Sequence, residues 1–128
     1  MKYPFLFIVL IAFSTSIAFA ETVVVLSGLP QVKVMSDFSG TEQVRMSESD
    51  QANYRCEIVK KGNDYYWASR KDMSLIYSES GTFYDFVEPS GSGYIRVVVA
   101  DGATYYMEHL TLGLKNITYW GAATEFTP

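Results

Sequence analysis

Short runs of β-branched and aromatic residues, separated by turn-forming residues, are the feature that most constrains the fold of this chain. Gly, Ser, Asp and Asn lie between the runs, and residues 94–100 are the most strand-like of them. Runs with turns about every 8–12 residues are typical of β-sandwiches and barrels. The linkers are too short for helical crossovers, so neighbouring strands should be antiparallel. The sequence therefore predicts an all-β fold, a single small antiparallel barrel or sandwich of about eight or nine short strands.

Two hairpins are predicted from alternating segments on either side of a turn. Residues 31–35 and 43–46 carry similar sequences and flank a linker rich in turn residues. Residues 54–59 and 65–69 flank a turn that contains Gly62, which permits the backbone conformations of a tight reversal. Both pairs are therefore expected to form antiparallel hairpins.

Three other segments are less regular. Residues 22–26 form a separate apolar strand that Ser27, Gly28 and Pro30 are expected to end. Residues 47–53 are polar and predicted to form a loop. Residues 109–114 are compatible with one helical turn.

The first twenty residues have the order of a secretory signal peptide. Lys2 is basic, residues 5–19 carry no charge, and Ala18, Phe19 and Ala20 form a small-residue cleavage signature. The apolar run is short for a membrane span, which needs about 20 apolar residues. We therefore expect a signal peptide at residues 1–20 and a soluble, periplasmic or secreted domain at residues 21–128, without stable membrane insertion after cleavage.

Charge excludes some partners. The chain has 10 Lys and Arg and 14 Asp and Glu, and Lys2 is the only charged residue before Glu21, so the mature net charge is −5. The basic residues form pairs and no long run. Nucleic acid and anionic membrane surfaces are therefore not expected as partners.

The residues that usually carry catalysis are scarce. His109 is the only histidine and Cys56 the only cysteine, and no spacing typical of a zinc site occurs. We therefore predict no catalytic residues, no metal site, no cofactor and no enzymatic activity. Cys56 is expected to be buried on the inner face of its strand together with Tyr54 and Ile58, and unpaired. An intermolecular disulfide and a reactive thiol are the alternatives.

Aromatic residues are abundant, with 15 in the mature chain once the five before Glu21 are removed from the 20 Phe, Trp and Tyr of the sequence. They form clusters such as residues 65–67 and 83–86. Neighbours on a strand point to opposite faces, so some rings should lie outside the core. One interpretation is cross-strand stabilisation of the sheet. The other is an exposed binding face, for which Tyr66 and Trp67 are candidates.

The segment 78–84 is a candidate binding loop. Ser80 and Gly81 form a small polar tip, and Phe83 and Tyr84 follow on opposite sides of the next strand. One ring should anchor the loop in the core, and the other should be available to a protein or glycan partner. We therefore predict that this loop, with Ser80 and Gly81 at its tip, contacts the partner.

The residues Tyr54-x-Cys56, Gly62, Leu75 and Ser80-Gly81-x-x-Tyr84 resemble a pattern in the small periplasmic inhibitors of C-type lysozyme. The resemblance implies an eight-stranded barrel whose Ser-Gly loop plugs the cleft of lysozyme. Ser80, Gly81 and Tyr84 would then be the contacts.

The chain departs from this family, and about thirty extra residues precede the matching region. The family has a second cysteine near its C-terminus and this chain has none, and residues 119–123 match its final strand only in part. Residues 65–96 also resemble small secreted bacterial proteins, which implies no activity.

Together these patterns favour a non-enzymatic secreted or periplasmic binding module. A lysozyme inhibitor is the specific alternative, and a small cell-wall or glycan-active enzyme is the second alternative.

Overall fold

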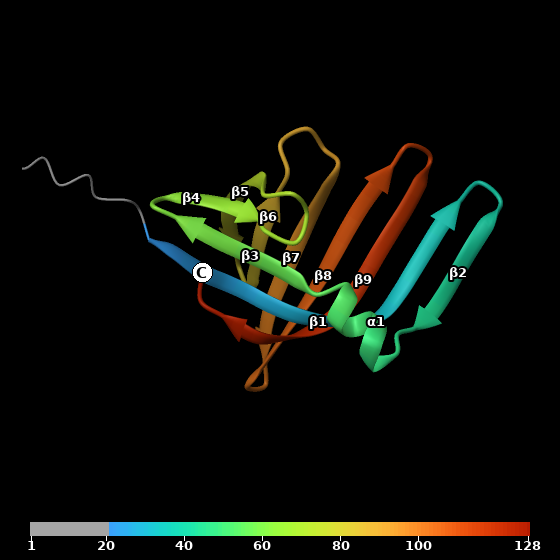
Figure 1. Cartoon of the computed structure of the whole chain (residues 1–128), viewed down its shortest axis with the longest axis horizontal. Coiled ribbons are helices and arrows are strands. Elements are labelled where there is room, and N and C mark those ends of the chain that lie inside the picture. The colour runs from blue at the N-terminus through green and yellow to red at the C-terminus, as the bar shows by residue number, and fades with distance from the viewer. Residues whose placement is uncertain (1–20) are drawn as a thin grey trace, which may run out of the picture.

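Nine antiparallel strands and one short helix form residues 21–128, the part of the chain that our computed structural model describes (Figure 1). The signal peptide predicted at residues 1–20 lies outside the described residues. The elements in chain order are β1 (Thr22–Asp37), β2 (Gly40–Arg45), α1 (Glu48–Asn53), β3 (Cys56–Lys61), β4 (Asp64–Trp67), β5 (Met73–Ser80), β6 (Phe83–Val87), β7 (Gly93–Ala100), β8 (Ala103–Leu112) and β9 (Lys115–Phe126).

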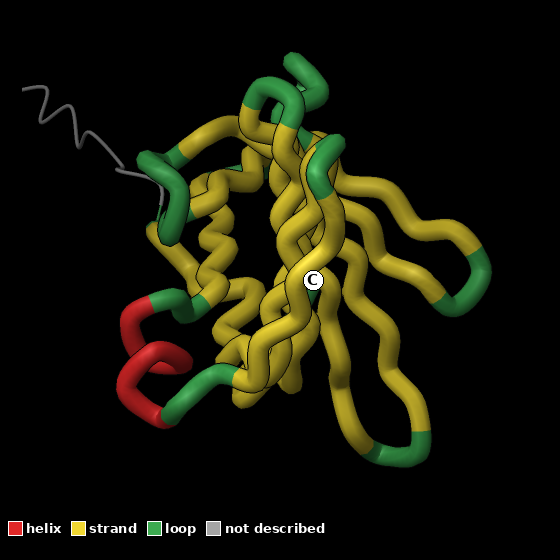
Figure 2. Tube along the Cα trace, turned by 90° about the vertical axis from the view of Figure 1, so that its right-hand side faces the viewer, coloured by secondary structure: helices red, strands yellow, loops and turns green. Residues whose placement is uncertain are grey.

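The sheet closes on itself because its first and last strands pair. The strand order is β2-β1-β3-β4-β5-β6-β7-β8-β9, and β1 also pairs with β9. Eight strands therefore form a closed ring, and β2 is attached to the outside of it. Figure 2 looks into this ring of strands. The all-β prediction is confirmed, and of its two forms the barrel is the one observed.

β1 is one bulged strand, so the prediction of separate strands at 22–26 and 31–35 was wrong. Its first part pairs with β3 and its last part with β2. Register shifts occur between Ser27 and Gly28 and between Pro30 and Val32 in the pairing with β9. A bulge leaves backbone groups out of the ladder, so Pro30 can lie within the strand without removing a required donor.

Residues 47–53, predicted as a loop, contain the helix α1. Ser47 is its N-cap, and the Ser47 side chain accepts a hydrogen bond from the Asp50 N–H at 3.2 Å. Glu48 and Asp50 place negative charge in the first turn, where it interacts favourably with the helix dipole. Serine followed three residues later by an acid is a recognisable capping signal. The loop prediction rested on the polarity of the segment and did not take this signal into account.

The helical turn considered for residues 109–114 does not form. β8 continues to Leu112, and Leu112 pairs with Lys115 across a two-residue turn. Gly113 in that turn has a φ of 63°, which suits glycine. The two predicted hairpins, by contrast, are confirmed as the β1–β2 and β3–β4 pairs.

The core fills the inside of the ring. Cys56 is fully buried and unpaired, as predicted, and Ile58 is buried beside it. Tyr54 was expected on the same inner face, but it is 41% exposed because it ends α1 before β3 begins. The largest fully buried side chains include Trp67 and Phe86.

The ring of Tyr106 lies between two glycines on neighbouring strands. A Cβ at Gly28 would come within 2.3 Å of the Tyr106 ring. A Cβ at Gly121 would lie 2.3 Å from the Leu29 carbonyl oxygen and 2.8 Å from the Tyr106 ring. Both glycines therefore make room for one buried aromatic side chain.

We predict that Gly28→Ala and Gly121→Ala each destabilise the protein by about 1–3 kcal/mol, because overpacking forces neighbouring atoms to move. Gly28→Ala should be partly rescued in combination with Tyr106→Leu, since the three atoms nearest to the added Cβ all belong to the Tyr106 ring. Gly121→Ala should not be rescued, because the Leu29 backbone crowds it as well. Urea unfolding of the single and double variants measures both couplings, and equal rescue at the two sites would contradict this packing.

Candidate functional site

An aromatic face covers the outside of the barrel over β6, β7, β8 and β9. Phe83, Val98 and Tyr105 pair across β6, β7 and β8 and form one row. Asp85, Arg96, Met107 and Trp120 pair across β6 to β9 and form the next row. The two rows are adjacent because alternate residues of a strand point to the same face. We call the set Phe83, Arg96, Val98, Tyr105, Met107 and Trp120 the outer aromatic face.

The outer aromatic face is hollowed and accessible. These six residues and Tyr106 line a hollow of about 280 Å³. Trp120 and Tyr105 are each 49% exposed, and Phe83 is 40% exposed. Arg96 is fixed within this set, because its guanidinium lies 4.8 Å from the centre of the Phe83 ring and bonds both oxygens of Asp85 at 2.7 and 3.0 Å. Rigid apolar rings around an oriented cation make this the strongest candidate for a binding site.

The predicted loop at 78–84 is a tight hairpin that leads into this face. Ser80 pairs with Phe83, and Ser80 and Gly81 are exposed at the tip. Tyr84 packs against the core and makes an edge contact with Phe126 at 5.1 Å, whereas Phe83 points to the outer aromatic face. The expected directions of the two rings are confirmed, because Tyr84 anchors the hairpin and Phe83 stays accessible. Binding by Ser80, Gly81 and Tyr84 stays a prediction.

The other two predicted binding residues have different positions. Tyr66 is half-buried on β4, with the Lys61 ammonium 5.5 Å from its ring centre. Trp67 is fully buried, so its assignment to an exposed binding face was wrong. The strand alternation that separates these neighbours directs Trp67, not Tyr66, into the barrel.

Trp67 instead belongs to a polar cluster inside the barrel. Its indole N–H donates to Glu108 Oε2 at 2.9 Å, and Arg70 Nη2 donates to Glu108 Oε1 at 2.9 Å. Glu108 is 1% exposed, and Arg70 lies 5.7 Å from the centre of the Tyr119 ring. Burial raises the pKa of the Cys56 thiol, and the neighbouring Glu108 carboxylate raises it further. This thiol is therefore unsuited to nucleophilic chemistry at neutral pH.

The structure keeps the histidine and the cysteine apart. His109 lies on the outside of β8, where its Nδ1 is 2.9 Å from the Thr118 hydroxyl and its ring lies against Tyr94, whereas Cys56 is inside the barrel. Within residues 21–128, no three His, Cys, Asp or Glu side chains are placed to hold a metal ion.

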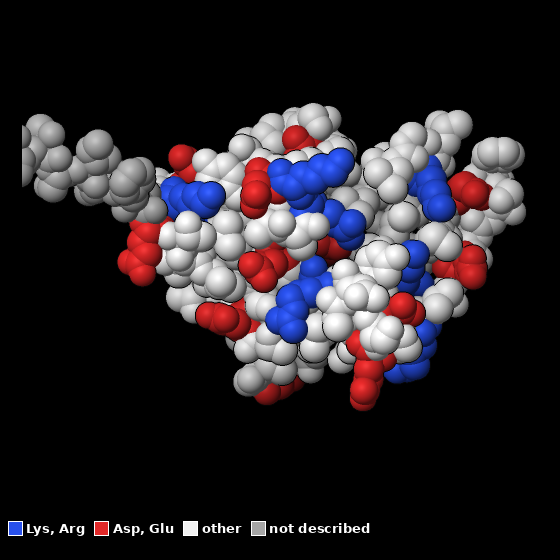
Figure 3. Space-filling model, in the orientation of Figure 1, with Lys and Arg blue, Asp and Glu red and all other residues white. Residues whose placement is uncertain are grey.

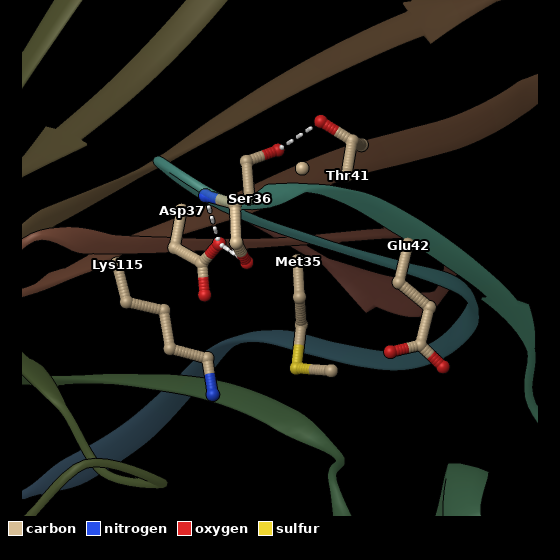
Figure 4. A pocket seen from close by; sticks show the side chains of 8 residues that line it. Met35, Ser36, Asp37, Thr41, Glu42 and Lys115 are labelled. Carbon is tan, nitrogen blue, oxygen red and sulfur yellow. Dashed lines mark hydrogen bonds between the residues drawn. The ribbon is translucent and has the colours of Figure 1, made fainter.

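A second, polar hollow of about 350 Å³ lies near the β1–β2 turn (Figure 4). Asp37, Glu42 and Lys115 line it from three strands. The Asp37 carboxylate accepts hydrogen bonds from the Ser39 N–H at 2.8 Å and the Ser39 hydroxyl at 2.5 Å, and these bonds lower the pKa of Asp37. The Asp37 carboxylate of this hollow is thus already bonded within its own turn, so the outer aromatic face is the better candidate.

Surface charge offers no single-sign patch on the face that Figure 3 shows. Basic and acidic side chains alternate over β1, β3 and the β1–β2 hairpin there. Among residues 21–128, no helix has the length and apolar character needed to cross a membrane.

The closed ring of eight antiparallel strands makes this protein a small β-barrel protein. No protein-family model, curated protein or solved structure matches the chain.

The Arg70–Glu108 and Arg96–Asp85 ion pairs differ in burial, so comparing them tests how much Glu108 contributes to stability. We predict that Glu108→Ala destabilises the protein by about 3–5 kcal/mol, because it leaves the Arg70 charge and the Trp67 N–H without their acceptor. Asp85→Ala removes the exposed pair with Arg96 and should cost at most about 1 kcal/mol. Urea unfolding of both variants measures the difference, and similar losses would show that Glu108 does not organise the core.

Proposed function

We propose that this protein is a non-enzymatic, secreted or periplasmic binding module that holds its partner on the outer aromatic face. The observation that carries the proposal is the set of exposed rings, Phe83, Tyr105 and Trp120, arranged around the fixed Arg96 guanidinium. Trp, Tyr and Arg are the residue types that dominate binding hot spots. Export rests on the signal-like order of residues 1–20.

Rigidity supports this use of the face. The rings project from paired strands and not from loops, and Asp85 holds Arg96 in one orientation. A surface ordered before binding loses little conformational entropy when a partner arrives. The chemistry suits a protein surface or the apolar face of a glycan ring.

We predict that Trp120→Ala weakens partner binding at least tenfold, because truncating a central aromatic anchor commonly costs about 2 kcal/mol or more. Tyr66→Ala is the matched control, since Tyr66 is an aromatic residue on β4 outside the face. Capture from periplasm or medium, followed by titration of the captured component, measures both variants. Soluble peptidoglycan fragments serve as the defined glycan probe. A loss with Tyr66→Ala and none with Trp120→Ala would move the site to β4.

Inhibition of lysozyme is the second candidate function. The hairpin tip at Ser80 and Gly81 is exposed, Tyr84 anchors it, and the barrel has the eight strands that the resemblance implies. Addition of the protein should then slow lysis of cell walls by C-type lysozyme. Ser80→Arg should abolish the effect by blocking insertion of the tip, whereas Trp120→Ala should leave it unchanged. Absence of inhibition at micromolar protein would exclude this function without affecting the outer aromatic face.

A further inference from the structure

A third hollow, of about 290 Å³, lies at an end of the barrel and shares no lining residue with the outer aromatic face. The β4–β5 turn, the start of β5, the β6–β7 loop and the end of β8 form it. Its lining residues are Arg70, Lys71, Met73, Ser92, Leu110 and Leu112. The mouths of β-barrels are common places for small ligands, whose pockets begin at about 300 Å³.

Arg70 has hydrogen-bond donors that the protein does not use. A guanidinium carries five N–H donors. Arg70 donates from Nη2 to Glu108, and its Nε has no partner among the described residues. The Arg70 side chain is 27% exposed. Arg96 differs, because its Nε and Nη2 are both bonded to Asp85. The Nε atom of Arg70 is buried, so a ligand in the hollow can reach only the exposed part of the Arg70 guanidinium.

The turn that carries Arg70 adds a second cation. Lys71 and Asp72 have φ values of 55° and 52°, a left-handed conformation that non-glycine residues rarely adopt. The turn is held by bonds from the Arg70 N–H to the Trp67 carbonyl at 3.0 Å and from the Met73 N–H to the Arg70 carbonyl at 3.3 Å. Lys71 makes no ion pair within residues 21–128. The residues lining the hollow include two cations and no acid.

The rest of the lining is apolar. Met73, Leu110 and Leu112 form its wall, and Leu112 is 57% exposed. We propose that this hollow binds a small amphipathic carboxylate, with the alkyl chain on the apolar wall and the carboxylate on the exposed part of the Arg70 guanidinium beside Lys71. A carboxylate matches a guanidinium because two parallel N–H···O bonds can form between them.

Trp67 provides a direct readout. The Glu108 carboxylate that accepts from Arg70 also accepts from the Trp67 indole, so a ligand on Arg70 changes the surroundings of Trp67. The sequence contains two tryptophans, so the Trp120→Phe variant leaves Trp67 as the only one and alters the outer aromatic face at the same time. Titration of exported Trp120→Phe protein with octanoate should give a saturable change in Trp67 emission with a Kd below about 1 mM.

Two leucines of the β8–β9 hairpin provide a matched pair of variants. Leu112 lines the hollow, whereas Leu114, 86% exposed on the same turn, does not. Leu112→Glu should weaken octanoate binding at least tenfold through charge repulsion, and Leu114→Glu should leave it within twofold. Both sites are exposed, so neither change should unfold the barrel. Equal effects of the two substitutions would overturn the placement of the site.

The head group is tested with ligands of one chain length. Octanol should bind at least tenfold more weakly than octanoate because it cannot pair with Arg70. Equal binding of octanol would show that only the apolar wall matters and would overturn the role of Arg70. Tighter binding of octyl phosphate than of octanoate would overturn the carboxylate class. Absence of any saturable change with octanoate would overturn the proposal as a whole, and none of these outcomes bears on the outer aromatic face.

Discussion

A single buried carboxylate organises the inside of this barrel. Glu108 on β8 accepts hydrogen bonds from Trp67 on β4 and from Arg70 in the turn after it. In the ring of eight strands, β4 and β8 lie on opposite sides, so these bonds cross the core and connect walls that the backbone ladder does not join. A buried charge is tolerated only when it is paired and hydrogen-bonded. Glu108 therefore requires hydrogen-bond donors such as Trp67 and Arg70 on the opposite side of the barrel.

The same alternation that fills the core leaves aromatic side chains outside. Tyr106 and Glu108 point inward from β8, so Tyr105, Met107 and His109 point outward. Because Val98 and Arg96 pair with Tyr105 and Met107, the outward residues of four strands form one continuous surface. A barrel rich in aromatic residues therefore has a packed interior and an apolar exterior over β6 to β9.

Strand content and hairpins could be predicted from the sequence because period-two patterns and turn residues are local signals. The choice between a closed barrel and a sandwich could not be predicted, because the pairing of β1 with β9 depends on register between segments 80 to 100 residues apart. Pro30 also made β1 look like two strands. For the candidate site, the hairpin at Ser80 and the opposite directions of Phe83 and Tyr84 followed from alternation. Trp120 and Arg96 were missed because only the cross-strand register places them on the same face as Phe83.

The closure of the ring has a consequence for how the chain acquires its structure. Leu26 pairs with Phe126, and β1 contributes to the ladders of β2, β3 and β9, so β1 receives its last partner only after β9 has been synthesised. Contacts between distant segments form slowly, because loop-closure entropy opposes them. Hairpins can form early, but until the C-terminal strand arrives the long edge of β1 is open. The ring can therefore close only when β9 is present, and removal of β9 (Lys115–Phe126) would expose the edges of β1 and β8 at once.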